Sequence, residues 1–436
     1  MRNNLKLIFV FVSFFILTIM SVNGMKSPLM DIERNSSFLK IDDILLPPPL
    51  VIKTPLEEII MQRMSMRSFT QEPITDEELA TILWYAYGLR EDGELTVPKF
   101  NGNHACVIYV IRQDAVYTYN QDAHSLVFYK EGDYRAIVGT QYEAPVQLGL
   151  CWNTDIADAN IGCAEIGAVG QNIYFAAIGI GLGTVITAEI PPAINPIGLP
   201  PNHHGMAIMP LGHPEFDYNY LYRPMLFSLL PRIKNSNIGL TDVLEKRNEV
   251  TSWDSERINR ADLSHLIWAS YGYSYYLDRS DSGNPVKRHH TVPSAHGYYP
   301  LRIYAIKNNG IYQYIYGIYK IDTLGLPVVS FLLQKAIGDK RNKIAEASET
   351  FVNDAPLSII IICDVKLTNQ WDDLSDESLR WIWYYEAGAA AHNILLEATS
   401  RGLSGNIVTI NDKNMICSTL KLNQQDFDPM LVVTVG

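Results

Sequence analysis

The stretch Ile82–Gly88, ILWYAYG, decides the fold because the chain repeats it later as Leu266–Gly272, LIWASYG. A second landmark follows in the same order: Glu165–Asn172, EIGAVGQN, returns as Glu386–Asn393, EAGAAAHN. Landmarks that recur in a fixed order indicate two copies of one domain. The offset between the copies grows along the chain, which places insertions in the loops of the second copy.

Length and composition allow this organisation. The chain has 436 residues, of which 47% are hydrophobic and 19% charged, as is typical of folded globular proteins. We expect copy one at residues 50–230 and copy two at residues 240–436, with a linker where Pro, Asn and Ser interrupt the pattern near residues 230–239. The predicted fold class is α+β, with an antiparallel or mixed central sheet flanked by helices in each copy, and the copies form an intramolecular pseudo-dimer.

Each copy is expected to have the same order of elements. A first helix carries the Arg63 segment or its relic, and a second begins at Thr75, where Glu78 completes a capping box. Two strands with alternating aromatic residues, a short helix, an apolar strand, a long helix and a last strand follow. The long helix, Gly162–Gly181 in copy one and Ala387–Ala398 in copy two, is apolar all round and rich in Gly and Ala. Such helices are buried, so we expect the two to pack on each other along the pseudo-twofold axis.

Arg63, Ser65 and Arg67 alternate near an expected helix start. Guanidinium groups bind phosphate oxygens in pairs, a hydroxyl adds a further donor, and a helix start adds unpaired N–H groups. A solvated basic turn has the same spacing, so the segment alone is weak evidence for an anion site.

The first 24 residues resemble a targeting segment. A basic start is followed by an uncharged run, Leu7–Val22, and then by Asn23-Gly24. This predicts an export signal or a short signal-anchor, and hence an exported or membrane-associated protein at the cell surface. An uncleaved anchor that carries an intracellular domain is the other interpretation.

Several kinds of partner are not indicated. A net charge of −12 argues against nucleic acid, whose binding proteins carry a basic stripe. The five cysteines form no CxxC pair, and Cys106 and Cys363 are interpreted as buried strand residues. His203-His204 has no acidic or cysteine partner at ligand spacing, so it is interpreted as an exposed loop pair and no metal site is predicted.

Four segments carry a family resemblance. Met61–Gly88, MQRMSMRSFTQEPITDEELATILWYAYG, resembles the opening of the nitroreductase superfamily of FMN-dependent oxidoreductases. His290–Ile306, HTVPSAHGYYPLRIYAI, resembles its second signature and is most similar to the SagB-type branch, the azoline dehydrogenases of peptide maturation. Gly170–Ile190 and Ile208–Pro214, IMPLGHP, match the end of a copy. The resemblance covers residues 55–436 and implies two tandem nitroreductase-like domains.

Family members are intertwined homodimers that hold FMN at the interface. Carried onto this chain, the resemblance implies that an Arg-x-Ser-x-Arg segment of copy one faces a Pro-Ser-Ala segment of copy two, and that backbone N–H groups lie near the flavin N5. The implied cofactor-binding residues are Arg63, Ser65, Arg67, Ile186, Thr187, Ala188, Pro293, Ser294, Ala295, His296 and Gly297.

The reciprocal site looks lost. Copy two has Arg247, Glu249 and Thr251 where copy one has the arginine segment, and a carboxylate would repel a phosphate. Copy one has Phe100 where copy two has Ala295, and a phenyl ring would crowd the flavin. We therefore expect one FMN per chain, in a monomer that contains its own pseudo-dimer.

The resemblance implies hydride transfer between a reductant, for which NAD(P)H is possible, and a small-molecule or peptide substrate. Arg67 is the candidate for charge near the pyrimidine edge, and the candidate catalytic residues are Glu165, Glu386 and His296. The alternative role for both glutamates is to cap a helix and complement its dipole. Two other functions stay open: a flavin-binding or flavin-free pseudo-enzyme that acts as a binding module, and an azoline-to-azole dehydrogenase. For the latter, the expected Lys-Tyr pair upstream of Glu386 has no match in Asn369–Arg380.

Overall fold

A computed structural model describes residues 43–139, 142–216, 220–222, 229–254, 257–278, 287–316, 330–368 and 377–436. The predicted targeting segment lies outside these residues. Residues Ile44–Gly436 form one compact unit that contains both copies.

Copy one is built on an antiparallel sheet of seven strands in the order β1-β4-β3-β2-β5-β7-β6. Its elements are β1 (Ile44–Leu45), α3 (Leu56–Gln62), α4 (Asp76–Tyr87), β2 (Cys106–Ile111), β3 (Ala115–Asn120), β4 (Ser125–Glu131), α5 (Arg135–Val138), β5 (Val146–Asn153), α6 (Ala159–Ile180), β6 (Gly183–Thr184), η1 (Asn195–Ile197) and β7 (His203–Gly212).

Copy two repeats this order in an antiparallel sheet of six strands, β13-β12-β11-β14-β16-β15. Its elements are α7 (Leu240–Lys246), α8 (Arg260–Tyr271), β9 (Tyr273–Asp278), β10 (Lys287–His290), η2 (Ala295–Gly297), β11 (Leu301–Lys307), β12 (Gly310–Ile315), β13 (Phe331–Ile337), α10 (Arg341–Glu346), η3 (Thr350–Asp354), β14 (Leu357–Asp364), α11 (Val365–Thr368), η4 (Glu377–Ile382), α12 (Trp383–Ser400), β15 (Gly405–Thr409), α13 (Lys413–Leu420) and β16 (Phe427–Val435). The matching strand orders confirm two tandem α+β domains.

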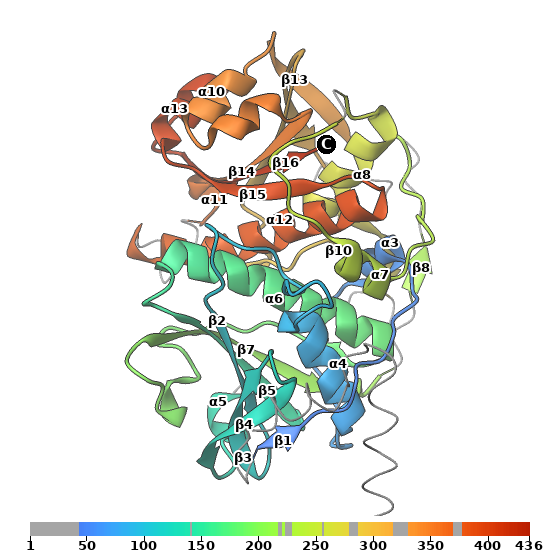
Figure 1. The fold of residues 1–436 in the computed structure, drawn as a ribbon, viewed down its shortest axis with the longest axis vertical. Helices are drawn as coiled ribbons and strands as arrows, with labels where there is room; N and C mark the ends of the chain where they lie inside the picture. The colour runs from blue at the N-terminus through green and yellow to red at the C-terminus, as the bar shows by residue number, and fades with distance from the viewer. Residues whose placement is uncertain are drawn as a thin grey trace, which may run out of the picture. The chain divides into compact units, whose positions relative to one another are not determined.

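The long helices α6 and α12 lie between the two sheets and pack on each other (Figure 1). Small residues allow the close approach, since a Cβ on Gly388 would overlap the carbonyl oxygen of Ala164, and one on Gly167 would overlap that of Tyr385. Farther along, His392 Nε2 lies 2.8 Å from Asn172 Oδ1, with both side chains buried. The helix pair is therefore the centre of the pseudo-dimer, as expected from its composition.

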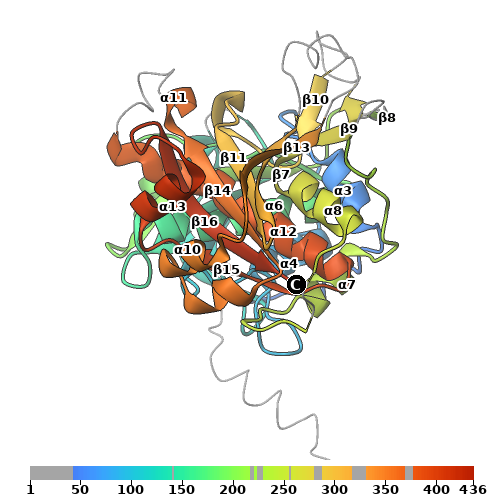
Figure 2. The ribbon, with the colours of Figure 1, turned by 90° about the horizontal axis from the view of Figure 1, so that it is seen from above.

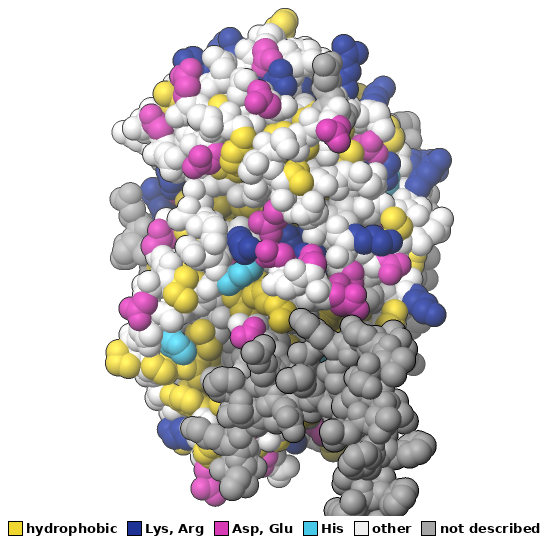
Figure 3. Space-filling model, in the orientation of Figure 1, with side chains coloured by type: hydrophobic (Ala, Val, Ile, Leu, Met, Phe, Trp, Pro, Cys, Tyr) yellow, Lys and Arg dark blue, Asp and Glu magenta, His cyan; other side chains and the backbone are white. Residues whose placement is uncertain are grey.

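One hydrophobic core continues through both copies, and each sheet has a smaller core on its outer face. Among the described residues, α6 is the helix long and apolar enough to cross a membrane, but 89% of that stretch is buried inside the protein. It is the core helix of a folded domain. On the face drawn in Figure 3, acidic and basic side chains are interspersed.

The copies are also joined away from the helix pair. A three-stranded sheet has the order β10-β9-β8, and β8 (Tyr220–Tyr222) precedes the linker while β9 and β10 follow it. The Leu240 N–H donates to the Thr54 oxygen at 3.1 Å, which ties the start of copy two to the start of copy one. Figure 2 shows this sheet beside α3.

The local predictions were right at caps and wrong in the number of strands. Thr75 caps α4, and both hydrogen bonds of the capping box with Glu78 are present. Between its second helix and its short helix, copy one has three strands, β2, β3 and β4, where we expected two, and the six-stranded sheet of copy two has β11, β12 and β13 at the same place. β13 is an edge strand, whereas β4 lies between β3 and the two-residue strand β1. Copy two also has α13 between its last two strands, which the sequence pattern did not indicate.

Candidate active site

The Arg63 segment follows the end of a helix, so the expectation of a helix start was wrong. α3 ends at Gln62, and Arg63 takes φ −57° and ψ 121°, which leaves the helix. The chain then runs extended, and the Met66 N–H donates to the Thr184 oxygen at 2.9 Å. The segment is held by β6 and supplies no free helix N-terminus.

Arg63 brings the two copies together. Its guanidinium is buried, donates from Nε to the His290 oxygen of β10 at 2.9 Å, and lies 5.2 Å from the ring centre of Tyr174. Arg63 Nη1 is buried and has no hydrogen-bond partner among the described residues. A buried cationic donor without an acceptor is costly, so this nitrogen is suited to an acceptor that is supplied from outside the chain.

Ser65 and Arg67 are more accessible. Ser65 Oγ lies 3.0 Å from the Tyr174 hydroxyl, which also accepts the Ile186 N–H at 2.9 Å. Arg67 is exposed and donates from Nη1 to the Ser65 oxygen at 3.0 Å. Tyr174 thus connects the arginine segment with the Ile186–Ala188 segment, although the sequence did not single it out.

The N–H groups expected near a flavin N5 are partly used within the protein. The Ile186 N–H donates to Tyr174, and the Thr187 N–H donates to the Ile208 oxygen at 2.9 Å. Ala188 is exposed and follows them directly.

The copy-two segment forms a strained loop. The backbone angle φ is positive at three of its residues: 51° at His296, 74° at Gly297 and 50° at Tyr299. Residues other than glycine rarely adopt such values. Ser294 Oγ fixes the loop, because it accepts the Tyr299 N–H at 2.9 Å and donates to Glu386 Oε2 at 2.6 Å. Pro293 is buried, Ala295 is half-buried, and His296 is exposed. Strain that neighbouring contacts maintain is typical of functional loops.

Glu386 is buried in the first turn of α12 and is bonded by Tyr271 and Ser294. Burial raises the pKa of its carboxyl from 4.5 to about 8, and the two hydroxyl donors only partly oppose this. Burial, together with the nearby Glu386, also raises the pKa of Tyr271. Burial thus favours the protonated form of Glu386 over the ionised one.

Glu165 occupies the equivalent place on α6 but is bonded differently. It lies inside the helix, since the cap is Asp158, and its carboxylate accepts the backbone N–H groups of Ala105 and Cys106 at 2.6 and 2.9 Å. The Tyr87 hydroxyl donates to it at 2.9 Å, and His104 Nδ1 lies at the same distance. These contacts hold the Glu165 carboxyl group in place through backbone N–H groups, whereas the Glu386 carboxyl group is bonded by the hydroxyls of Tyr271 and Ser294.

Further buried polar atoms near Arg63 also lack hydrogen-bond partners among the described residues. Gln171 Nε2 donates to the Thr291 oxygen at 2.8 Å, whereas Gln171 Oε1 and Thr291 Oγ1 are unsatisfied. The Tyr385 hydroxyl is unsatisfied as well, and its pKa is raised chiefly by burial while Arg63 lowers it. Unsatisfied groups from both copies thus accumulate around one guanidinium.

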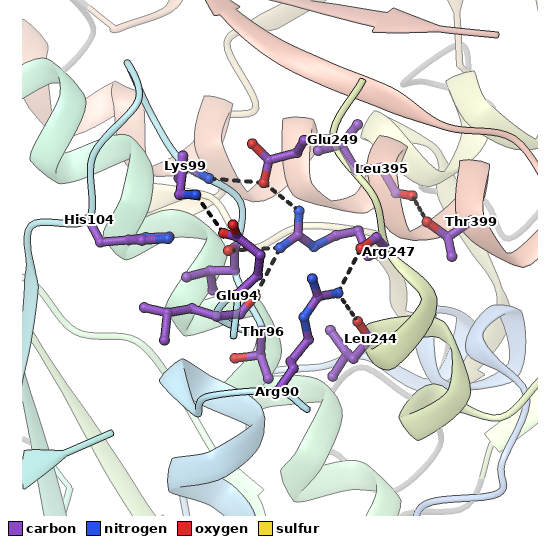
Figure 4. A network of polar contacts seen from close by, with 12 residues as sticks. Arg90, Glu94, Thr96, Lys99, His104, Leu244, Arg247, Glu249, Leu395 and Thr399 are labelled. Carbon is purple, nitrogen blue, oxygen red and sulfur yellow. Dashed lines mark hydrogen bonds and ion pairs between the residues drawn. The ribbon is translucent and has the colours of Figure 1, made fainter. Parts of the chain in front are cut away.

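The equivalent position in the other half, around Arg247, is filled by groups of the protein itself (Figure 4). Arg247 Nη1 donates to Glu249 Oε1 at 2.7 Å, and Nη2 donates to the oxygens of Leu95 and Val97 at 2.9 Å each. Arg247 is 3% exposed, and the Lys99 N–H also donates to Glu249, at 3.3 Å. A carboxylate of the protein thus occupies the position of an external anion at Arg247.

Two other observations complete the comparison of the halves. Phe100, the counterpart of Ala295, is 1% exposed and belongs to the shared core. His203-His204 is not the exposed loop pair that we expected, because it begins β7. His203 Nδ1 lies 2.7 Å from the Tyr109 hydroxyl, and the His204 ring lies 4.2 Å from that of Trp152.

Two adjoining cavities, of about 600 and about 470 Å³, lie at the start of α6. They share Asp158, Ala159 and Trp381, and none of the predicted flavin-binding residues lines either one. Cavity volume therefore indicates a different place from Arg63, whereas the unpaired polar side chains indicate the surroundings of Arg63.

Comparisons with known proteins agree on one family. The profile of the Nitroreductase family matches residues 60–213 and 244–436. A protein of Methanocaldococcus jannaschii, provisionally named a nitroreductase, is 30% identical over 213 residues, which are 48% of this chain and 94% of the relative.

Solved structures give a similar picture at the level of the fold. An Anabaena variabilis structure that also carries a provisional nitroreductase name aligns with a TM-score of 0.62, over 83% of this chain and 88% of its own, at 15% identity. A Desulfovibrio desulfuricans structure in complex with FMN aligns with a TM-score of 0.29, over 37% of this chain and 87% of its own, at 23% identity. The second likeness is too low to place a ligand here.

Proposed function

Because the chain belongs to the nitroreductase family, we propose that it is an FMN-dependent oxidoreductase with one cofactor site, located between its two copies. The observation that carries this proposal is the difference between two equivalent arginines. Arg63 has a buried terminal nitrogen, Nη1, without a partner among the described residues. Both terminal nitrogens of Arg247 bind groups of the protein itself, and its atom without a partner in the described part of the chain is the inner Nε.

The residues around Arg63 fit the polar groups of FMN. The phosphate and the pyrimidine edge both offer hydrogen-bond acceptors, and Arg63, Ser65 and Arg67 offer donors on the side of copy one. From copy two, Ser294 and Ala295 would line the ring. The site needs both copies, and a family homodimer would supply the same two segments from two chains.

Bound FMN would supply the hydride chemistry of the family. The chain's own part is to orient the ring, to place positive charge near its pyrimidine edge and to hold a proton. Glu386 can hold that proton, because burial raises its pKa to about 8, and Ser294 Oγ lies 2.6 Å from its Oε2. We therefore place Glu386 as a proton reservoir that acts through Ser294.

The substrate is a small organic molecule or a peptide, and NAD(P)H is the transient electron donor in this proposal. Azoline oxidation by a SagB-type enzyme has less support, because Asn369–Arg380 contains neither Lys nor Tyr. The binding-module interpretation differs in outcome. A flavin-binding module would be yellow but would not be bleached by NADH or NADPH, and a flavin-free module would be colourless.

The test is a count of FMN per chain by absorbance and mass. We expect one FMN in the wild type, loss of the flavin in Arg67→Ala, and an unchanged content in Thr251→Ala. Both side chains are exposed, so neither substitution disturbs the core. Two flavins per chain, or equal loss from both variants, would overturn the single asymmetric site.

A further inference from the structure

A buried cluster of ionisable side chains lies on the seam between the copies, apart from the residues assigned to the flavin. Glu57 of α3 comes from copy one, and His265 of α8 and Glu397 of α12 come from copy two. One ligand atom of each lies within 4.8 Å of the others, and the residues are 0%, 2% and 0% exposed. Figure 2 shows α3 next to α8.

The hydrogen bonds of this cluster are incomplete. Glu57 Oε2 accepts from the Ser236 N–H and hydroxyl, both at 3.1 Å, and Glu397 Oε1 lies 2.6 Å from His265 Nδ1. Glu397 Oε2 is buried and has no partner among the described residues. Glu57 Oε1 has only a long contact of 3.4 Å with Ser400 Oγ, whose hydroxyl also donates to the Glu397 carbonyl at 2.9 Å. One oxygen of each carboxylate thus needs a positive group.

A divalent cation fits the cluster better than a shared proton does. A proton can link one oxygen of Glu57 to one oxygen of Glu397, but it leaves the imidazole outside that bond. A cation between the three side chains can bind both carboxylates and the imidazole at once. The guanidinium of Arg401 is paired with Asp262 at 2.5 Å.

We propose that Glu57, His265 and Glu397 form a structural site for a divalent cation, Zn²⁺ by preference, that fastens copy one to copy two. Two carboxylates and one imidazole are ligands that suit Zn²⁺, and a hydroxyl or water completes four-coordination. Binding requires two adjustments. The Lys234 N–H donates to His265 Nε2 at 3.3 Å, so a metal bound at Nδ1 moves the imidazole proton to Nε2 and breaks this long contact. With metal–ligand bonds of about 2.0 Å in a tetrahedral site, the 2.6 Å between His265 Nδ1 and Glu397 Oε1 must widen to roughly 3.3 Å.

The fold itself does not require these charges. At the equivalent positions of the other half stand Thr241, Thr81 and Ala176. There the Ile52 N–H donates to Thr241 Oγ1 at 2.8 Å and the Leu50 N–H to Thr81 Oγ1 at 2.9 Å, so hydroxyls bind the segment that leads into α3. The half with the carboxylates has replaced these neutral contacts by a set of metal ligands.

The experiment is a metal count on the full chain. We expect about one zinc per chain after dialysis, its loss on chelation with a fall in the melting temperature, and recovery of both when Zn²⁺ is returned. Co²⁺ added to the stripped protein should give the visible absorption of a four-coordinate site. Glu397→Gln should lose the metal, and Glu58→Gln, a half-buried neighbour on α3, should keep it.

Measurements on the wild-type protein alone can overturn the proposal, so the test does not depend on whether a variant folds. A stripped chain whose melting temperature does not respond to Zn²⁺, Mn²⁺ or Mg²⁺, and which shows no Co²⁺ band, holds a shared proton instead of a cation. The proposal is independent of the flavin, because metal content and melting temperature are measured equally well on flavin-free protein.

Discussion

The crossing of α6 and α12 gives the sharpest test of the pseudo-dimer, through the substitution Gly388→Ala. Alanine favours a helix over glycine by about 1 kcal/mol, so local propensity predicts a more stable protein. The structure predicts the opposite. The new Cβ would overlap the Ala164 carbonyl oxygen, which is backbone and cannot rotate away.

The size of the effect follows from the competition of these two terms. Forcing an extra methyl group into a closely packed core costs typically 1–3 kcal/mol, and more where only backbone can yield. After subtraction of the helix gain, we expect a net loss of about 2 kcal/mol, which lowers the melting temperature by roughly 4 °C or less in a protein of this size. Because α12 also carries Glu386, the flavin content should fall with it.

Gly179→Ala is the matched control on the partner helix. Its Cβ would meet the side chain of Ile52, with Cδ1 and Cγ2 both at 2.7 Å, and a side chain can shift where the Ala164 backbone cannot. Circular dichroism during heating measures both variants. Equal melting temperatures for Gly388→Ala and Gly179→Ala would show that the helices do not approach as closely as the structure has them, and would refute the reasoning.

Two further predictions concern one carboxyl and one cap. Burial raises the pKa of Glu386 from 4.5 to about 8 in the folded state. Its contribution to stability is therefore full below pH 4.5 and is lost as the pH rises to about 8. Glu386→Gln should make the melting temperature less dependent on pH over this range, and an unchanged pH dependence would count against a protonated Glu386. Thr75→Ala removes the acceptor of the Glu78 N–H at 3.2 Å and should cost about 1 kcal/mol in urea unfolding, whereas an effect below a few tenths would mean that the start of α4 frays without cost.

The sequence predicted those parts of the fold that depend on local pattern. Recurring motifs revealed the duplication, and the apolar composition of Gly162–Gly181 predicted the buried helix pair. Thr75 and Glu78 predicted a helix start because both partners of that cap lie within one turn. The strands β4 and β13 were missed because their exposed residues dilute the aromatic alternation that marked their neighbours.

Only those residues of the candidate site that lie in recognisable sequence motifs could be predicted. The segments at Arg63 and Ser294 carry recognisable signatures. The structure brings Arg63 into contact with His290 of copy two, whereas Ser294 is bonded to Glu386 of its own copy. Tyr174 and Tyr271 were missed, because a tyrosine in an apolar helix has the same appearance whether or not its hydroxyl holds a functional group. Glu57, His265 and Glu397 lie on three helices far apart in the chain, so no spacing rule could have connected them.

Duplication explains why the two halves could become different. In a twofold homodimer every substitution occurs twice, so a glutamate in the arginine segment would close both cofactor sites together. A fused chain changes one half at a time. Glu249 closes the site at Arg247 and becomes an internal partner for a buried guanidinium, while Arg63 keeps an open donor. The same freedom leaves Glu165 bonded by backbone N–H groups and Glu386 bonded by two hydroxyls, with a raised pKa. Under the function proposed above, each half would keep the group that the other has converted to a structural role, and the cofactor site would need both.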